Sequence, residues 1–230
     1  MAEQNPDYSK NTSINWQENY SSMIASAAEA VARIRPGQRV FIGTGCAQPQ
    51  ELIQALINRA AELEVIDVIH LITLGEPSYR HKELAKHFHI NSFFIWDTIN
   101  ESQELGDFTP LFLSDIPRMF SSGELPIDVA LIQVTPPNEK GMCSLGISVD
   151  ITKSAAENAG FVIAQVNPNM PWTMGDNLLY VHDIDILVPS ENPILEVTLP
   201  EPTETSRRIA EYVAALIPDG STVELGIRRI

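Results

Sequence analysis

Three segments combine glycine, proline and small polar residues in positions where they could act on an anion or a carbonyl oxygen. Each follows an apolar run typical of a buried parallel strand: Arg39–Ile42, Asp128–Gln133 and Phe161–Val166. The segments themselves are Gly43–Pro49 (GTGCAQP), Pro136–Gly146 (PPNEKGMCSLG) and Asn167–Gly175 (NPNMPWTMG). In an open α/β sheet, ligands bind outside the carboxyl ends of the strands. We therefore predict that the three segments line a common cleft at that edge.

The segment Gly43–Pro49 lies between a predicted strand and a predicted helix. This order aims backbone amides at an anion or a carbonyl oxygen. The segment lacks both the full glycine pattern of a dinucleotide site and the lysine of a P-loop. On this pattern alone, a tight connection without chemistry is the favoured interpretation.

A sheet covered by helices is the scaffold that the pattern predicts for these segments. Apolar runs predict strands at 39–42, 65–74, 91–96, 128–133, 161–166 and 184–188. Helical spacing predicts helices at 21–34, 50–63, 78–87 and 150–158, and residues 97–123 read as irregular with helical pieces. The alternation predicts an α/β fold with a mostly parallel open sheet and helices on both faces.

The second segment belongs to the most specific motif in the chain. Pro136 and Pro137 remove two backbone donors, and Gly141 and Gly146 allow close approach of the backbone. The block PPNEKGMCSLGISVD resembles a signature of the acetyl-CoA hydrolase/transferase family, which includes 4-hydroxybutyrate and related class I coenzyme A transferases. Two further blocks agree in order and spacing: VNPNMPWTMGD (166–176) and SDIPR (114–118). The resemblance covers Trp16–Ile230, and the family's members are much longer than this chain.

The resemblance implies a fold of the CoA-transferase N-terminal type and a set of site residues. The implied acyl pocket and oxyanion loop are Gly43, Thr44, Gly45, Cys46 and Ala47, with backbone amides providing the electrostatic stabilisation. The implied cleft residues are Pro136, Pro137, Gly141, Ser144, Gly146, Asn167, Asn169, Met170 and Pro171. Trp172 stands where relatives usually have an arginine, so the resemblance does not fix the substrate preference. Arg118 could bind an anion or form a surface ion pair.

The resemblance also implies a nucleophile that this chain lacks. Relatives move coenzyme A between an acyl-CoA and a small carboxylate such as acetate through a glutamyl-CoA intermediate. By position, that glutamate would follow Ile230, because residues 217–227 (IPDGSTVELGI) resemble the opening of the second half. Glu76 and Glu139 are read as solvated loop acids. We expect an N-terminal half that is inactive alone and that works with a C-terminal half, with an acyl-CoA thioester as substrate and no permanently bound cofactor.

Two other functions remain open on the sequence. The chain could be an acyl-CoA-binding or regulatory module without catalysis. It could also be a stand-alone thioesterase that uses Cys46 or an internal carboxylate. A cysteine at a helix N-terminus can have a lowered pKa, but a small pocket residue is the favoured interpretation of Cys46. Cys143 is predicted to be a packed core residue.

The histidines do not predict a metal site. His70 lies inside an apolar run and is read as a core or edge histidine. His81, His87 and His89 are close in sequence, but their spacing does not place all three on one helical face. We predict a solvated helix end there and no metal.

Composition limits the class of partner. The 230 residues carry a formal net charge of −15, which argues against a nucleic-acid surface and repels the phosphates of coenzyme A. Two cysteines, no signal peptide and no apolar run of membrane length predict a cytoplasmic protein. We expect a homo-oligomer that binds neither nucleic acid nor membrane.

The chain divides into four predicted parts. Residues 1–16 read as a loose arm and 17–188 as the α/β domain. A linker at 189–205 contains Pro189, Pro193, Pro200 and Pro202. Residues 206–230 read as the start of a second domain, with an amphipathic helix at 206–217 and a strand at 222–227.

Overall fold

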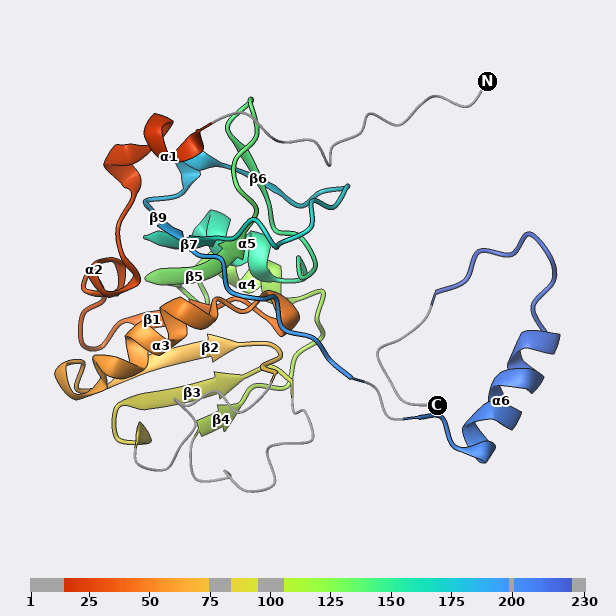
Figure 1. Ribbon diagram of the computed structural model, residues 1–230. Coiled ribbons are helices and arrows are strands. Elements are labelled where there is room, and N and C mark those ends of the chain that lie inside the picture. Colours follow the sequence, from red (N-terminus) through yellow and green to blue (C-terminus); the bar gives the residue numbers. More distant parts are fainter. Residues whose placement is uncertain (1–14, 75–83, 95–105, 199–200, 225–230) are drawn as a thin grey trace. The chain divides into compact units, whose positions relative to one another are not determined.

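A seven-stranded parallel sheet forms the centre of the computed structural model, which describes residues 15–74, 84–94, 106–198 and 201–224 (Figure 1). The strand order is β4-β3-β2-β1-β5-β7-β9. The strands are β1 (Arg39–Ile42), β2 (Ile66–His70), β3 (Phe88–Ser92), β4 (Gly106–Phe108), β5 (Val129–Val134), β7 (Val162–Val166) and β9 (Ile186–Pro189). The predicted α/β class and open parallel sheet are confirmed.

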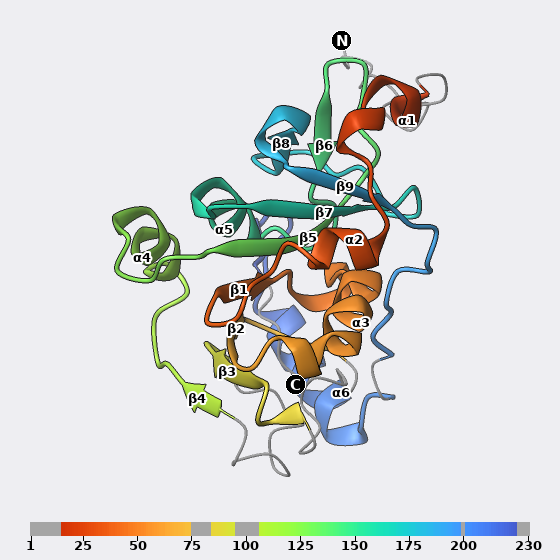
Figure 2. The same ribbon diagram turned by 90° about the vertical axis from the view of Figure 1, so that its left-hand side faces the viewer.

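Helices cover both faces of this sheet (Figure 2). One face packs against α2 (Ala27–Val31) and α3 (Gln50–Asn58), and the other packs against α4 (Ile116–Ser122) and α5 (Thr152–Asn158). Successive residues of β5 alternate between the two cores: Leu131 lies in the first and Ile132 in the second. Every residue of β5 and β7 is buried, which explains why the sequence of each strand is apolar except for one glutamine.

Several predicted boundaries are wrong for local physical reasons. The helix expected at 21–34 is interrupted, because Ile24 pairs with Leu187 beside β9 and Ser26 then caps α2. The capping box between Ser26 and Glu29 lowers the pKa of Glu29, whose carboxylate accepts hydrogen bonds from the Ser26 side chain and backbone. A short helix, α1 (Trp16–Asn19), and a 3₁₀ turn at Ser21–Met23 precede this point.

Other elements also begin or end away from their predicted limits. The strand expected at 65–74 ends at His70, and the one expected at 91–96 runs from Phe88 to Ser92, where Phe88 pairs with Ile66. The helix expected at 50–63 ends at Asn58, before a 3₁₀ turn at Ala60–Glu62. Most of the helix expected at 78–87 lies outside the described residues.

Two short strands form a separate arm, which the sequence did not predict. In it, β6 (Met142–Ser144) pairs antiparallel with β8 (Leu178–Tyr180), and a 3₁₀ turn at Val181–Asp183 follows. The post-β5 segment, predicted as a stiff loop, therefore folds back as half of a two-stranded ribbon. The short β4 was not predicted either, whereas α4 lies within residues 97–123, where helical pieces were expected.

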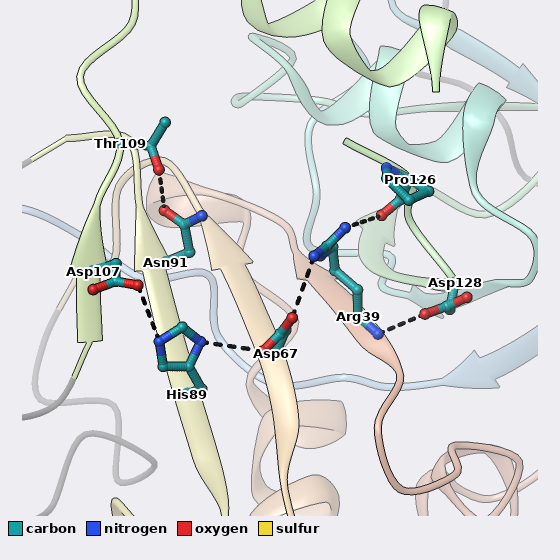
Figure 3. Close-up of polar contacts among 8 residues, drawn as sticks. All are labelled: Arg39, Asp67, His89, Asn91, Asp107, Thr109, Pro126 and Asp128. Carbon is teal, nitrogen blue, oxygen red and sulfur yellow. Dashed lines mark hydrogen bonds and ion pairs between the residues drawn. The ribbon is translucent and has the colours of Figure 1, made fainter. Parts of the chain in front are cut away.

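The amino ends of the strands carry a row of charged side chains (Figure 3). This charged row consists of Arg39, Asp67, His89 and Asp107, one residue from each of β1 to β4. Asp67 lies between Arg39 at 3.3 Å and His89 at 3.1 Å, and the other ring nitrogen of His89 lies 3.2 Å from Asp107. The row is partly open to solvent, with side-chain exposure from 30% for Arg39 to 74% for Asp107.

The chain divides into two compact units, residues 1–196 and 197–230. In the second, α6 (Glu204–Ala215) begins at the capping residue Thr203. No residue of α6 is buried, although Ile209, Tyr212, Val213 and Leu216 recur at helical spacing. Residues 222–224 are not in a strand, and the remainder of the strand expected at 222–227 lies outside the described residues. Among the described residues, none of the helices has the length and apolar character needed to cross a membrane.

Candidate functional site

The order of strands changes direction between β1 and β5. From β1 the chain proceeds outward through β2 and β3 to β4, and from β5 it proceeds to the other edge through β7 to β9. In doubly wound folds, ligands bind at this switch point, outside the carboxyl ends of the strands. The three segments singled out in the sequence, here called the carboxyl-edge loops, follow β1, β5 and β7: Gly43–Pro49, Pro136–Gly146 and Asn167–Gly175. Two of them flank the switch point directly.

The post-β1 loop is held closely by its neighbours. Gly43 N–H donates to Leu131 O and Gly45 N–H donates to Ile72 O, both at 2.8 Å. Gly45 has φ +59°, and a Cβ there would lie 2.8 Å from Ser148 Oγ, so the position requires glycine. Ala47 N–H also donates within the loop, to Thr44 O at 3.2 Å. Three of the predicted oxyanion-loop amides are thus used by the fold, and any electrostatic role falls on the loop's other N–H groups.

Asp150 links this loop to the segment that follows the second one. The Thr44 hydroxyl, which is buried, donates to Asp150 Oδ2, and Asp150 Oδ1 accepts from the backbone of Ile151 at 2.6 Å and of Thr152 at 3.2 Å. Asp150 has φ +25°, a value that non-glycine residues rarely adopt. Such strain persists only where the surroundings enforce it. Asp150 is the last residue of the motif PPNEKGMCSLGISVD, but the sequence alone does not show that it organises the site.

The second and third loops meet at Gly146. It has φ +66°, and a Cβ there would lie inside the van der Waals radius of Met170 Sδ and 3.1 Å from Pro171 O. The Thr173 hydroxyl donates to Gly146 O at 2.7 Å. The structure therefore brings Gly146, Met170 and Pro171 together. Gly141 lies elsewhere, in the turn beside the Tyr20 hydroxyl.

Ser144 belongs to a buried polar cluster beneath these loops. Its hydroxyl oxygen accepts from Gly146 N–H and from Asn177 Nδ2, both at 3.1 Å. Asn177 is itself buried, and among the described side chains its Oδ1 is a buried atom without a hydrogen-bond partner. The full burial of Ser144 gives it a structural role in holding the loop. Of the two prolines, Pro137 is buried and Pro136 is half-buried.

Asn167 and Asn169 hold the third loop to the chain after β9. Asn167 is fully buried, and its Nδ2 donates to Asn192 O at 2.8 Å. Its Oδ1 accepts from Asn169 N–H at 2.9 Å, which makes a tight turn. The exposed Asn169 donates to Glu191 O at 2.9 Å. Asn167 also contacts Gln133, one of three buried glutamines that the sequence reasoning missed: Gln48, Gln133 and Gln165.

The two cysteines have different environments. Cys46 is half-buried in the 3₁₀ turn Gly45–Ala47 of the post-β1 loop. Cys143 is fully buried in β6, and burial raises its pKa to about 12. Cys143 is therefore a protonated core residue at neutral pH, in agreement with its predicted role.

The remaining predicted residues lie apart from these contacts. Arg118 is exposed on α4, Glu139 is exposed in a turn within the Pro136–Gly146 loop, and Trp172 is half-buried in the third loop. His70 is buried at the end of β2. His87 directly precedes β3, and its Nδ1 contacts Glu64 O. His89 lies in β3 and is a member of the charged row. Glu76 and His81 lie outside the described residues. Within the described part of the chain, no three His, Cys, Asp or Glu side chains come together in a way that could hold a metal ion.

Comparisons with known proteins identify the family of the chain. Residues 8–198 match the family model "Acetyl-CoA hydrolase/transferase N-terminal domain". The chain is 37% identical over 217 residues to 4-hydroxybutyrate coenzyme A transferase of Clostridium kluyveri. The match covers 94% of this chain and 51% of that protein. It is 34% identical over 207 residues to a succinyl-CoA:acetate/propanoyl-CoA:succinate CoA transferase of Fasciola hepatica, with coverage of 88% and 43%.

The solved structures give the same result. The fold superposes with a TM-score of 0.79 on the crystal structure of 4-hydroxybutyrate CoA-transferase from Porphyromonas gingivalis, at 36% identity. The match covers 93% of this chain and 50% of that one. The chain therefore spans about half the length of the relatives it matches.

Proposed function

Because the chain belongs to the acetyl-CoA hydrolase/transferase family, whose N-terminal domain it carries, we propose that its carboxyl-edge loops form one wall of an acyl-CoA site. The observation that carries the proposal is the convergence of the loops at the switch point between β1 and β5. Thr44–Asp150, Gly45–Ser148 and Gly146–Met170 are contacts between segments far apart in the sequence. This is the edge where doubly wound folds bind ligands.

The chemistry that we propose is transfer of coenzyme A from an acyl-CoA to a small carboxylate such as acetate. The post-β1 loop would supply backbone N–H groups to the thioester oxygen, whose negative charge grows as the carbonyl is attacked. Gly43 to Ala47 are the residues that we expect around the acyl group. Glycine and alanine leave room for it, and the tight packing of the loop holds its amides in place.

We further propose that the nucleophile is a glutamate in the half of the relatives that this chain does not match. Its carboxylate would attack the acyl-CoA carbonyl to give an acyl-glutamyl anhydride and release the coenzyme A thiolate. Attack of that thiolate on the anhydride would give a glutamyl-CoA thioester and free the original carboxylate. Within the described carboxyl-edge loops, Glu139 is an exposed turn residue, and its position gives no support for the same role.

The partner that we propose is the C-terminal half found in the longer relatives, in an oligomer of complete subunits. The exposed apolar stripe of α6 supports this proposal, since an amphipathic helix is stable when its apolar face is covered. The net charge of −15 also supports it, because the phosphates of coenzyme A need cationic contacts. Lys153, beside the third loop, is already paired with Asp176 and Glu157.

The test is an acyl-CoA:acetate transfer assay on this chain alone, on the C-terminal half of a 4-hydroxybutyrate CoA-transferase relative alone, and on the two together. We expect thioester transfer only from the mixture. Gly45→Val in the mixture should lower kcat by about 100-fold, because it moves the oxyanion loop. Turnover by this chain alone, abolished by a thiol-blocking reagent, would instead support a thioesterase based on Cys46.

A further inference from the structure

Four residues with buried side-chain amides are connected by hydrogen bonds across the carboxyl edge of the sheet, three through their side chains and Gln48 through its backbone carbonyl. This amide chain consists of Gln48, Gln133, Gln165 and Asn167, which are exposed by 5%, 2%, 0% and 0%. Gln133 and Gln165 point to the same side of the sheet as Leu131 and Ile163, which belong to the apolar core on the face covered by α2 and α3. Apolar side chains would suit these positions, so the presence of amides requires an explanation.

Gln133 is the centre of the chain. It is the register partner of Gln165 on the neighbouring strand. Its Oε1 accepts from Gln165 Nε2 at 3.0 Å and from Asn167 Nδ2 at 2.9 Å. Its Nε2 donates to the backbone carbonyl of Gln48 at 3.2 Å. One side chain thus joins the loop after β1 to β7 and to the loop after β7, across the switch point.

The outer members of the chain hold further backbone segments. The Gln48 side chain pairs with both the N–H and the carbonyl of Leu74, each at 3.2 Å, and so ties the post-β1 loop to the segment after β2. Gln165 Oε1 accepts from Glu51 N–H at 3.0 Å, at the start of α3, where Pro49 supplies no side-chain cap. With the bond from Asn167 to Asn192 O, the chain reaches the segments that follow β1, β2, β7 and β9.

Burial of an amide is unfavourable unless its hydrogen bonds are replaced, and here they are replaced mainly by the backbone of irregular loops. A fully bonded buried network contributes chiefly by selecting one arrangement of the groups that it joins. In this chain those groups are loops, because β5 and β7 are already fixed by their own ladder. The network therefore acts on the position of the loops more than on the pairing of the strands.

We propose that Gln133 is a positioning residue for the acyl site: through Gln48 O it holds the Gly43–Pro49 loop at the distance from the Asn167–Gly175 loop that the thioester requires. The assignment rests on the proposed function, because it takes the post-β1 loop as the oxyanion loop. Displacement of catalytic groups by about 1 Å can reduce rates about 100-fold. Gln133 makes no contact with substrate in this role; it acts through the loop.

Cys46 offers a direct readout of the loop. It is half-buried within the loop itself, whereas Cys143 is fully buried, with a pKa of about 12. Release of the loop alone would expose only Cys46, but general loosening of the domain would expose both thiols.

The experiment is alkylation by iodoacetamide in the absence of denaturant, with each thiol quantified by mass spectrometry, for the wild type, Gln133→Met and Ile163→Val. Ile163, buried in β7 on the same face, is the control for loss of core packing.

We expect Cys46 of Gln133→Met to be alkylated at least about fivefold faster than Cys46 of the wild type, with Cys143 unmodified. In Ile163→Val, the rate at Cys46 should stay within about twofold of the wild-type rate. Hydrogen exchange should accelerate in a peptide covering 43–49 and not in one covering 129–132. Alkylation rates measured across pH separate access to the Cys46 thiol from a change in its acidity. At high pH the thiol is fully ionised, so the plateau of the rate reports access alone, and we expect this plateau to be higher in Gln133→Met than in the wild type. Equal rates in the two variants, or labelling of both thiols together, would overturn the proposal.

If Gln133→Met does not fold, Gln133→Asn provides the same test, since it keeps an amide but is one methylene group too short to reach Gln48 O. No acceleration at Cys46 in that variant would also overturn the proposal. The proposed function is tested separately by binding of acetyl-pantetheine, a thioester without the nucleotide phosphates that the net charge of −15 repels. If the variant is alkylated faster but the wild-type chain does not bind the thioester, Gln133 positions the loop and the acyl-site assignment is wrong. If the wild-type chain binds the thioester but alkylation is unchanged in the variant, the acyl site is supported and the positioning role of Gln133 is wrong.

Discussion

The two ends of the parallel sheet are held together by different chemistry. At the amino end, the charged row joins β1 to β4 through one ion pair and two histidine–carboxylate contacts, whose side chains are 30–74% exposed. At the carboxyl end, the amide chain is at most 5% exposed and bonds the backbone of loops. Exposed ion pairs contribute little and are screened by salt, whereas a buried donor or acceptor that loses its partner is costly. The contacts at the carboxyl end, which carries the proposed site, are thus the more costly to break.

The largest effect that we expect at the carboxyl end comes from Gly146→Ala. The new Cβ would collide with Met170 Sδ in a backbone region that favours glycine, so the free energy of unfolding should fall by about 2–4 kcal/mol. Urea denaturation followed by circular dichroism measures it. Gly37→Ala is the matched control: φ there is +77° with nothing within 4 Å of a Cβ, and only the backbone cost of about 1 kcal/mol should appear. Equal losses would show that Met170 can move aside.

Gln133→Met should have the next largest effect. It leaves Gln48 O, Gln165 Nε2 and Asn167 Nδ2 each short of a bond, and we expect a loss of about 1–3 kcal/mol in the free energy of unfolding. This loss should be the same at low and high salt, because no charge is involved. A loss that disappears in high salt would contradict the contrast between the two ends.

Cys143 gives a pH-dependent effect at the carboxyl end. Its pKa is raised from 9.0 to about 12 by burial, so the folded chain keeps the thiol protonated where the unfolded chain would ionise it. The contribution to stability is complete below pH 9 and is lost as the pH rises from 9 toward 12. Unfolding free energies measured across this range should fall less steeply in Cys143→Ala, by up to about 1.4 kcal/mol per pH unit. Identical slopes in wild type and variant would contradict the assignment.

The smallest effect should come from the charged row. Asp67→Asn removes the carboxylate between Arg39 and His89, and we expect a loss of about 0.5 kcal/mol or less at low salt. Raising the ionic strength should reduce that loss further. Unfolding curves at the two ionic strengths provide the measurement, and a salt-independent loss as large as that of Gln133→Met would remove the distinction between the two ends.

The difference between the two ends also explains what the sequence could predict. The buried strands β5 and β7 were predicted closely, because burial on both faces makes every residue of each strand apolar except one glutamine. The carboxyl-edge loops were identified from their glycines and prolines. The amide chain was missed, since the contact between Gln133 and Gln165 depends on the register of two strands, which a single sequence does not reveal. A glutamine inside an otherwise apolar run was the available signal.

Short elements were missed for a similar reason. With three residues each, β4, β6 and β8 depend on pairing with distant segments and carry almost no pattern of their own. The break in the predicted helix at 21–34 depends on a bridge from Ile24 to Leu187, a contact across most of the chain. Ser26 followed by Glu29 is a local capping signal that would have given the correct start of α2.

The most direct test of the acyl-site assignment is a titration of the isotope-labelled chain with acetyl-pantetheine, observed by NMR of the backbone amides. This thioester keeps the pantetheine arm of coenzyme A without its nucleotide phosphates, so the charge of −15 does not oppose binding. We predict that the largest shifts fall on Gly43–Ala47 and on residues around Gly146 and Met170, while the amides of Arg39, Asp67 and His89 stay unchanged. Shifts centred on the charged row, or none at millimolar thioester, would contradict the assignment.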